Sequence, residues 1–306
     1  MREVIEEAIE QVGTVVLGKE QQIRLAVACL LSEGHLLIED LPGMGKTTLA
    51  HALAQVFNLS YSRIQFTSDI LPADIIGAPV FDKESGRFEF HEGPVFNQLI
   101  LADEINRTTP KSQSALLEAM EERQVSVDGE PRQLPEPFFV IATQNPSTSA
   151  GTFPLPESQL DRFLMRLELG YPDPAAERIL LKEQDRRIVI STLKPVINLL
   201  DLKALQAACK EVKVSEALLD YIQRIIAYTR ESSEFTHGLS PRGAMALLSS
   251  AKSWAFMEDR SYVVPEDVQA VLPPVVEHRL RDAADHHDRA GTAIAQRLLA
   301  RVDVIG

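Results

Sequence analysis

The sequence predicts an α/β fold in which a parallel sheet with crossover helices is followed by an all-helical region. Up to about residue 170, short β-rich runs alternate with helical patterns, as in strand–helix–strand units. Beyond Pro172 no further strand pattern follows, and the segment Gly170–Pro174 has the turn chemistry of a domain boundary. We therefore predict an α/β domain over residues 1–171 and a helical domain over residues 172–306.

Five short runs are predicted as the strands of the sheet. Several of them are continuously apolar, which is typical of parallel strands buried on both faces. They cover residues 35–39, 61–66, 98–103, 137–142 and 163–168.

Two hairpins are predicted to be inserted between these strands. In the first, residues 78–82 and 87–91 flank a short loop. In the second, residues 125–127 lead into Asp128-Gly129, a strong two-residue turn signal. Because Pro131 lacks a backbone N–H, it confines the returning strand to a sheet edge.

Helical patterns occupy the start of the chain and its second half. The first residues, Met1 to Val12, form an acidic amphipathic pattern that is neither a signal peptide nor a transit peptide. Further helices are predicted over residues 174–188, 201–212, 215–230, 241–257 and 265–280.

The composition is that of a soluble globular protein. Hydrophobic residues make up 45% of the 306 residues and charged residues 25%, which excludes a disordered tail or a disulfide scaffold. Cys29 and Cys209 lie in apolar helical patterns and are predicted to be core thiols in a reducing compartment. No run reaches the roughly 18 apolar residues that a membrane span needs. We therefore expect a cytoplasmic protein.

Acidic residues outnumber basic residues by 44 to 31, which gives a formal net charge of -13. Such a field disfavours binding to nucleic acid or to an anionic membrane, although a local basic channel in an oligomer would escape this average. Charge alone therefore does not identify a partner.

A glycine-rich turn between a strand and a helix is the strongest chemical signal. The first predicted strand runs into Asp40-Leu-Pro-Gly-Met-Gly-Lys-Thr-Thr48, where a helical pattern begins. This order is that of the phosphate-binding loop of nucleoside triphosphatases: glycines turn backbone N–H groups toward an anion, Lys46 reaches the β- and γ-phosphates, and Thr47 offers a hydroxyl to Mg²⁺. Asp40 departs from the general pattern, which has a glycine there. The alternative is a strand-to-helix turn that contains Gly-Lys-Thr by chance.

Polar side chains follow two further predicted strands. The apolar run that starts at Leu99 ends in Asp103 and Glu104. Asp103 can hold the Mg²⁺ shell, and Glu104 can polarise a water molecule for attack on the γ-phosphate. Asn145, after the fourth predicted strand, can position that water. The alternatives are a solvated pair of acids and an Asn-Pro turn, and the phosphate loop makes both less favoured.

Together with the helical second half, these features resemble the AAA+ ATPases. Within that class, the two inserted hairpins and the segments Glu39–Gly43, Ala102–Arg107, Ala142–Pro146 and Leu155–Phe163 are similar to the MoxR family. The resemblance covers nearly the whole chain, and Asp40 is compatible with it. It implies a five-stranded sheet of order 5-1-4-3-2, a helical lid, and a ring, commonly a hexamer, with nucleotide at the subunit interfaces.

The resemblance also implies roles for individual residues. Asn145 corresponds to the sensor asparagine, and Glu104 to the general base. Thr47 and Asp103 correspond to the Mg²⁺ positions. The backbone of Val16, Leu17 and Gly18 corresponds to the adenine contacts, and the phosphates would be bound by Gly43, Met44, Gly45, Lys46, Thr47 and Thr48.

Two arginines are assigned to phosphates by the same resemblance. Arg162 matches the arginine finger that reaches the γ-phosphate of a neighbouring subunit. Arg242 matches the second sensor, an arginine at a helix start that reaches back to the phosphates of its own subunit. The planar, permanently charged guanidinium suits both roles. Arg166 and Arg107 are the alternatives for the finger.

An acidic and histidine-rich cluster near the carboxyl terminus is predicted to be a solvated helix and not a metal site. It consists of Asp282, Asp285, His286, His287 and Asp288.

The sequence therefore predicts an Mg²⁺-dependent ATPase that couples hydrolysis to the remodelling or activation of a protein client. The resemblance implies a chaperone-like role and a separate partner chain with a von Willebrand factor A domain. The alternatives are a nucleic-acid motor and a nucleotide-sensing module without turnover. The net charge and the acidic first hairpin argue against the motor, and Glu104 argues against a pure switch.

Overall fold

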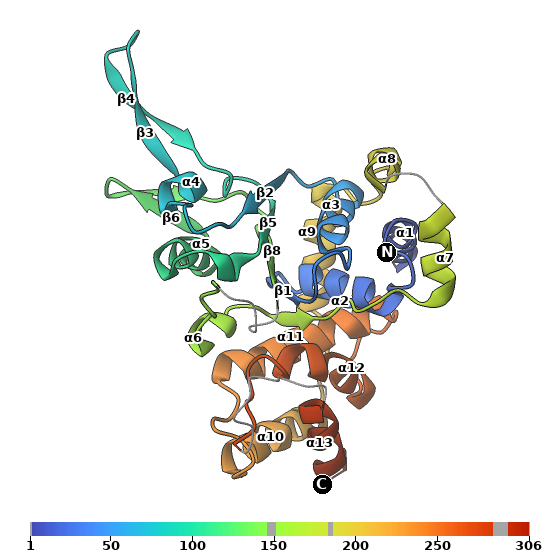
Figure 1. Ribbon diagram of the computed structural model, residues 1–306. Coiled ribbons are helices and arrows are strands. Elements are labelled where there is room, and N and C mark those ends of the chain that lie inside the picture. The colour runs from blue at the N-terminus through green and yellow to red at the C-terminus, as the bar shows by residue number, and fades with distance from the viewer. Residues whose placement is uncertain (1, 146–150, 183–185, 284–292, 306) are drawn as a thin grey trace.

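The computed structural model describes residues 2–145, 151–182, 186–283 and 293–305, and its centre is a five-stranded parallel sheet (Figure 1). Neighbouring strands lie in the order β2-β5-β8-β1-β9. Numbered along the chain within this sheet alone, that order is 2-3-4-1-5, the expected order seen from the other edge. The strands are β1 (Leu36–Glu39), β2 (Tyr61–Gln65), β5 (Leu99–Asp103), β8 (Phe139–Gln144) and β9 (Met165–Leu167).

Each face of the sheet has its own hydrophobic core, because successive side chains of a strand point to opposite faces. Leu36 and Ile38 belong to one core and Leu37 to the other. The first face is covered by α1 (Arg2–Gly13), α2 (Glu20–Leu31) and α3 (Lys46–Val56), and the second by α4 (Pro72–Ile76) and α5 (Pro110–Glu122). This burial on both faces explains the continuously apolar strands.

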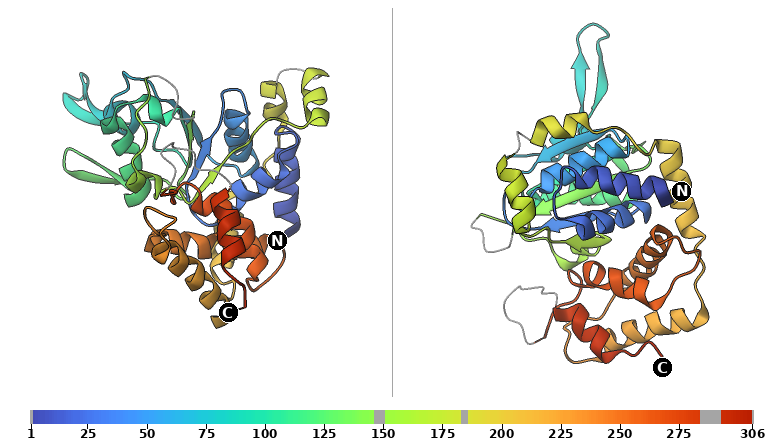
Figure 2. Two further views of the ribbon diagram at one scale, coloured as in Figure 1. Left: turned by 60° about the horizontal axis from the view of Figure 1, so that its bottom comes forward. Right: turned by 90° about the vertical axis from the view of Figure 1, so that its right-hand side faces the viewer.

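Both predicted hairpins are present. The hairpin of β3 (Gly77–Asp82) and β4 (Arg87–Glu92) projects away from the rest of the molecule (Figures 1 and 2). The hairpin of β6 (Gln124–Val127) and β7 (Glu130–Gln133) contains Pro131, which lies in a two-stranded sheet where every strand is an edge. Two short helical elements, η1 (Ile105–Arg107) and α6 (Glu157–Leu160), follow strands β5 and β8 along the chain.

The described part of the chain beyond β9 is helical. The predicted helix over 174–188 corresponds to two helices, α7 and α8, with residues 183–185 outside the described ranges. The last helix, α13, was not predicted, and α12 ends earlier than expected. The helices are α7 (Pro174–Lys182), α8 (Arg186–Thr192), α9 (Leu199–Lys210), α10 (Glu216–Glu231), α11 (Pro241–Met257), α12 (Pro265–Val276) and α13 (Ala293–Arg301).

The helical half shares a hydrophobic core with the first face of the sheet. Polar contacts reinforce this packing: the Gln206 side chain donates to the carbonyl of Leu30 at 2.9 Å, and the hydroxyls of Ser32 and Ser253 are 2.8 Å apart. Cys29 lies fully buried in this core as a free thiol, and burial raises its pKa. The boundary near residue 171 stays a prediction, because the core runs across it.

Within the described ranges, none of the helices combines the length and the apolar character that a bilayer crossing requires. The same part of the chain contains no cluster of three or more metal-ligating side chains. Most of the acidic and histidine-rich cluster, residues 285–288, lies outside the described residues.

Candidate functional site

The predicted phosphate loop joins β1 to α3 at the carboxyl edge of the sheet. Gly43 and Gly45 have φ angles of 86° and 90°, in the left-handed region that glycine adopts without strain. Gly45 is the N-cap of α3, and no side chain of the described residues caps that helix. The first N–H groups of α3 are therefore available to an anion. Thr47 is exposed in this first turn, whereas Met44 packs against the core.

Lys46 is buried and points back over the loop. Its ammonium group donates to the carbonyl of Asp40 and, at 3.2 Å, to Oδ1 of Asn145. Burial lowers the pKa of Lys46, and the neighbouring carboxylates of Asp40, Asp103 and Glu104 oppose that shift. The lysine therefore lies among carbonyl, amide and carboxylate oxygens, where a phosphate group can replace the Asp40 carbonyl as its partner.

Asp103 ends β5 with both carboxylate oxygens engaged. Oδ1 accepts from the Thr143 hydroxyl at 2.6 Å, and Oδ2 accepts from Arg63 Nη2 at 2.6 Å. A hydroxyl at Thr47 and a carboxylate at Asp103 are the oxygen donors that Mg²⁺ prefers, so the residues present fit this ion. Because the Asp103 oxygens already accept hydrogen bonds, Asp103 fits best as a partner of the water molecules around the metal.

Glu104 has a φ angle of 57°, which is uncommon for a residue with a side chain. Its backbone N–H donates to the Thr143 hydroxyl at 2.9 Å, so the same hydroxyl fixes both acidic residues. Oε1 of Glu104 accepts from Asn145 Nδ2 at 3.0 Å, and Oε2 lies 3.2 Å from Arg107 Nε and from Gln65 Nε2. This turn aims the carboxylate into the same space as Lys46 and Asn145.

Arg162 and Arg242 form a second cluster around one carboxylate. Arg162 Nη2 is 2.8 Å from Oε2 of Glu121, and Arg242 Nη2 pairs with Oε1 of the same side chain. The two arginines come from different halves of the chain, since Arg162 precedes β9 and Arg242 begins α11. The structure therefore brings together the two predicted phosphate-binding arginines.

This second cluster lies at the amino edge of the sheet, opposite the phosphate loop. Next to Glu121, the carbonyl of Met120 accepts from His35 Nε2 at 3.2 Å, and His35 immediately precedes β1. From His35 to Asp40 the chain rises along β1 by about 16 Å. Lid packing therefore places Arg242 beside Arg162 and away from its own phosphate loop, and the expectation that Arg242 reaches the phosphates of its own subunit stays a prediction.

Comparison with known proteins agrees with this architecture. Residues 35–165 match the ATPase family associated with various cellular activities (AAA), and residues 227–298 match the AAA lid domain. The chain is 39% identical to chaperone MoxR1 of Mycobacterium tuberculosis over 285 residues, which are 90% of this chain and 75% of that protein. The chain belongs to the MoxR family of AAA+ ATPases.

Further relatives of this MoxR-family chain match over nearly its full length. A Bacillus subtilis protein named YeaC is 43% identical over 299 residues, 97% of this chain and 93% of that protein. The crystal structure of a candidate ATPase from Cytophaga hutchinsonii is 36% identical and covers 99% of this chain and 95% of its own, with a TM-score of 0.88. The chain thus shares its fold with the Cytophaga protein over nearly its whole length.

The two alternatives for the finger are both engaged within the MoxR-family fold. Arg166 is buried on β9, where it pairs with Glu39 at 2.6 Å and with Glu168 at 2.8 Å. Arg107 pairs with Glu104 of its own site. Arg162 is engaged as well, with Glu121, so its assignment as the finger stays a prediction.

The segment expected at adenine connects α1 to α2. Gly18 has a φ angle of 67°, and an added Cβ would lie 2.8 Å from the Asp173 carboxylate. Lys19 Nζ donates to the carbonyl of Tyr171 at 2.5 Å, so the segment is held against the start of the helical half. Val16 is buried and Leu17 is partly buried.

Three residues of this site carry no sequence signal of their own. Thr143 binds both acidic residues, and Arg63 and Gln65 on β2 each bind one of them. Their common feature is that they lie near the carboxyl ends of strands next to β5. The expected strand order places β2 and β8 on either side of β5, so it indicated the strands from which such partners come but not which of their residues bind the two acids.

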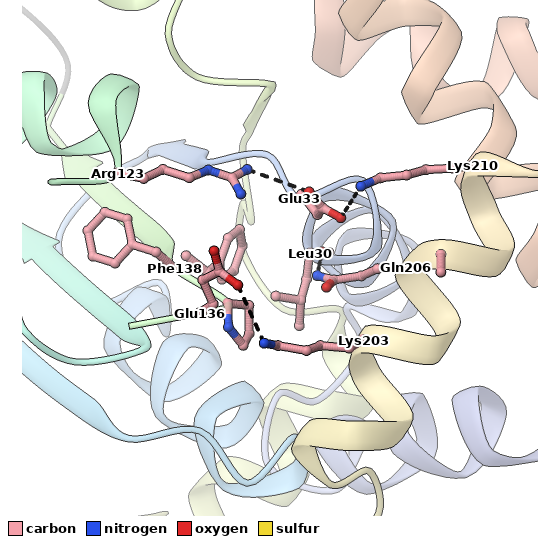
Figure 3. Close-up of a pocket in the computed structure, with 11 residues that line it drawn as sticks. Leu30, Glu33, Arg123, Glu136, Phe138, Lys203, Gln206 and Lys210 are labelled. Carbon is pink, nitrogen blue, oxygen red and sulfur yellow. Dashed lines mark hydrogen bonds and ion pairs between the residues drawn. The ribbon is translucent and has the colours of Figure 1, made fainter. Parts of the chain in front are cut away.

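A cavity of about 380 Å³ opens elsewhere, between α9 and the loop before β8 (Figure 3). Its cations are already paired: Glu33 lies between Arg123 and Lys210, and Lys203 pairs with Glu136 at 3.5 Å. Because Arg123 directly follows α5, the cavity lies near the amino edge of the sheet and is separate from the phosphate loop.

Proposed function

We propose that the chain is an Mg²⁺-dependent ATPase that hydrolyses ATP to ADP and phosphate at the carboxyl edge of its sheet. The observation that carries this proposal is the position of Asn145, whose amide joins Lys46 at 3.2 Å to Glu104 at 3.0 Å. A phosphate-binding cation, a water-positioning amide and a general base then lie in one hydrogen-bonded row.

Each group has a distinct role in this proposal. The glycine loop and Lys46 bind the phosphates, and the backbone of residues 16–18 contacts adenine. Thr47 and, through water, Asp103 hold Mg²⁺, which when bound neutralises charge on the phosphoryl oxygens. Glu104 takes the proton from the attacking water, and Asn145 orients that water.

We infer that the neighbouring subunit completes the site in a ring, most simply a hexamer. Arg162 and Arg242 share one carboxylate at the edge opposite their own phosphate loop. If one of them reaches a neighbour's phosphates, the other does so too. Two guanidinium groups that converge on the same triphosphate would make hydrolysis dependent on assembly.

The expected client is a protein, engaged in a chaperone-like cycle with a separate partner that contains a von Willebrand factor A domain. The name of the Mycobacterium relative supports the chaperone role. The projecting hairpin supports a protein client, because Phe81 and Phe88 are exposed at 52% and 71% and meet edge to face. The same hairpin has more acidic than basic side chains, which argues against nucleic acid.

The test is ATP hydrolysis by the purified full chain with Mg²⁺. Lys46→Ala should lose nucleotide affinity, whereas Glu104→Gln should bind ATP and lose turnover. Glu118→Gln, on an exposed face of α5, is the matched control for the Glu-to-Gln change. A wild-type rate for Glu104→Gln would contradict the base assignment. Stimulation of hydrolysis by single-stranded DNA would favour the nucleic-acid motor. If the wild-type protein binds ATP and does not hydrolyse it, the sensing module is favoured.

The client is tested separately. Glu104→Gln, which should remain loaded with ATP, is used to capture proteins from native extract, with Lys46→Ala as the control. Proteins that are retained only by Glu104→Gln are candidate clients or partners. Equal recovery with the two variants would contradict ATP-dependent client binding.

A further inference from the structure

We propose that Glu121 is a positioning residue that sets Arg162 and Arg242 side by side for one phosphate group. This proposal rests on the proposed function, since it assigns the residue that prepares the two arginines for a neighbour's nucleotide. Each oxygen of the Glu121 carboxylate takes one guanidinium: Oε2 pairs with Arg162 at 2.8 Å, and Oε1 pairs with Arg242.

Charge explains why a carboxylate is needed between them. Two guanidinium groups that approach the same point repel each other, and the repulsion is strongest at the short separation that a shared phosphate requires. Glu121 offsets one of the two positive charges and leaves the cluster with a net charge of +1. In turn, the hydrogen bond from Arg242 lowers the pKa of Glu121, with burial opposing it and the charge of Arg162 adding to it, so the carboxylate stays ionised.

The backbones of both arginines are held by other contacts. Asp161 accepts from the hydroxyl of Ser240, the N-cap of α11, at 2.9 Å and from Arg279 Nε at 2.7 Å. Arg279 also donates to the carbonyl of Phe163 at 2.6 Å. These contacts fix the chain on both sides of Arg162 and next to Arg242 without Glu121. Loss of the Glu121 carboxylate should therefore release the guanidinium groups and leave the fold intact.

Glu121 is also the one carboxylate in the described ranges that lies within ion-pair distance of either arginine. Arg162 Nε is buried without a partner there, so the contact with Glu121 is what orients this guanidinium. The side chains of Glu121 and Arg242 remain 35% and 45% exposed, which leaves the pair open to a ligand from outside.

The test compares Glu121→Gln with Glu122→Gln in steady-state ATP hydrolysis. The protein concentration is set high enough that the rate per subunit no longer rises with it. Glu122 is an exposed neighbour at the end of α5, so the control makes the same charge change one residue away. For Glu121→Gln we expect kcat to fall by roughly 100-fold, the usual cost of misplaced catalytic groups. The KM for ATP should not change, because the phosphate loop is untouched. Glu121→Asp, which keeps the charge, should recover part of the loss.

A second measurement does not depend on hydrolysis. The rates at which phenylglyoxal modifies Arg162 and Arg242, followed by mass spectrometry of their peptides, should both rise in Glu121→Gln and not in Glu122→Gln. If both rates are unchanged, Glu121 does not hold the arginines and the proposal is overturned.

The two measurements together separate this proposal from the proposed function. If the wild type hydrolyses ATP and Glu121→Gln matches its kcat, the positioning role is overturned while the ATPase stands. A rise in KM at constant kcat would also overturn it. If the wild type hydrolyses no ATP, the proposed function fails, and the positioning role for that reaction fails with it. The phenylglyoxal rates would then report only whether Glu121 holds the two arginines.

Discussion

The Asp40 carboxylate accepts a 2.6 Å hydrogen bond from the backbone N–H of Gly170. Its other oxygen accepts from the N–H of Leu41 at 2.7 Å. Asp40 is the residue that replaces the glycine of the general phosphate-loop pattern, and its side chain ties the loop to the segment that enters the helical half. Because Lys19 binds Tyr171 in the same segment, the phosphate loop and the expected adenine segment share one anchor.

Asp40→Gly should therefore restore the general pattern and weaken the fold. Two hydrogen bonds to an ionised acceptor are lost, and such bonds contribute about 1.5–3 kcal/mol each in favourable cases. We expect a lower free energy of unfolding in urea, with ATP binding retained because the backbone of Gly43 to Lys46 is unaffected. Asp40→Asn keeps one acceptor oxygen, so its free energy of unfolding should lie between those of the wild type and Asp40→Gly. Unchanged stability of Asp40→Gly would show that the contact with Gly170 contributes nothing.

Asn145→Ala should separate binding from turnover. The side chain links Lys46 to Glu104, so its removal leaves both groups without a common partner. We expect kcat to fall by roughly 100-fold, since the attacking water loses its orienting amide. The dissociation constant for ATP, measured by calorimetry in the Glu104→Gln background, should change little. Asn97→Ala, away from this row, is the control. A large loss of ATP affinity with normal kcat would contradict the water-positioning role.

His35 should make the fold less stable in acid. The ring is buried; its Nε2–H donates to Met120 and its Nδ1 accepts from the N–H of Val140 at 3.1 Å. Burial lowers the pKa of His35 to about 4, against an ordinary value of 6.5. Below pH 6.5 the unfolded chain binds this proton and the folded chain does not. The contribution of His35 to the free energy of unfolding is therefore fully present above pH 6.5 and is lost progressively toward pH 4.

At pH 5 this loss amounts to about 2 kcal/mol for His35 alone. Urea unfolding of the wild type at neutral pH and at pH 5 should show it, and His35→Gln should reduce the difference. Burial also lowers the pKa of His278, whose Nε2 lies 3.0 Å from the carbonyl oxygen of Phe163, so part of the pH dependence should remain. His237→Gln, an exposed histidine, is the control. An equal pH dependence in His35→Gln and the wild type would contradict this account.

Local sequence signals explain why the sheet, and the meeting of polar residues at its carboxyl edge, could be predicted. Strands β1, β5 and β8 contain continuous apolar runs. Asp103, Glu104 and Asn145 lie at or directly after the ends of β5 and β8, and Lys46 follows β1 across the glycine-rich loop. Any parallel sheet brings such positions together, so sequence order is nearly enough. Thr143 could not be assigned in the same way, because one threonine in a strand has many uses.

The position of Arg242 depends on contacts between residues distant in sequence. The hydroxyl of Ser240 binds Asp161, which is 79 positions earlier in the chain, and Arg242 binds Glu121, which is 121 positions earlier. No local pattern encodes these pairs. A helix start with Ser-Pro-Arg fixes the direction of α11 but not the edge of the sheet against which the lid packs. The same limit applies to the shared core of α2 and α11.

Mixtures of inactive subunits should show which site Arg242 serves. Lys46→Ala mixed with Arg162→Ala is the positive control. Where the intact loop of an Arg162→Ala subunit meets the intact finger of a Lys46→Ala subunit, an active interface forms. An arginine finger contributes about 10³–10⁵ in rate in other phosphoryl-transfer systems, so even partial recovery should be measurable. Recovery in this mixture establishes that subunits exchange and that inactive neighbours do not block the ring.

The decisive mixture is Arg162→Ala with Arg242→Ala. If both arginines of one subunit act on the same neighbouring site, as their shared contact with Glu121 indicates, every interface in the mixture lacks one of them. No activity should then return beyond that of the separate variants. Suppose instead that Arg242 serves its own subunit. A site formed by the loop and Arg242 of an Arg162→Ala subunit and by the Arg162 finger of an Arg242→Ala neighbour would then be complete, and activity would recover as it does in the control. Phosphate release at several mixing ratios distinguishes the two cases, and recovery here would mean that the Glu121 contact separates when ATP binds.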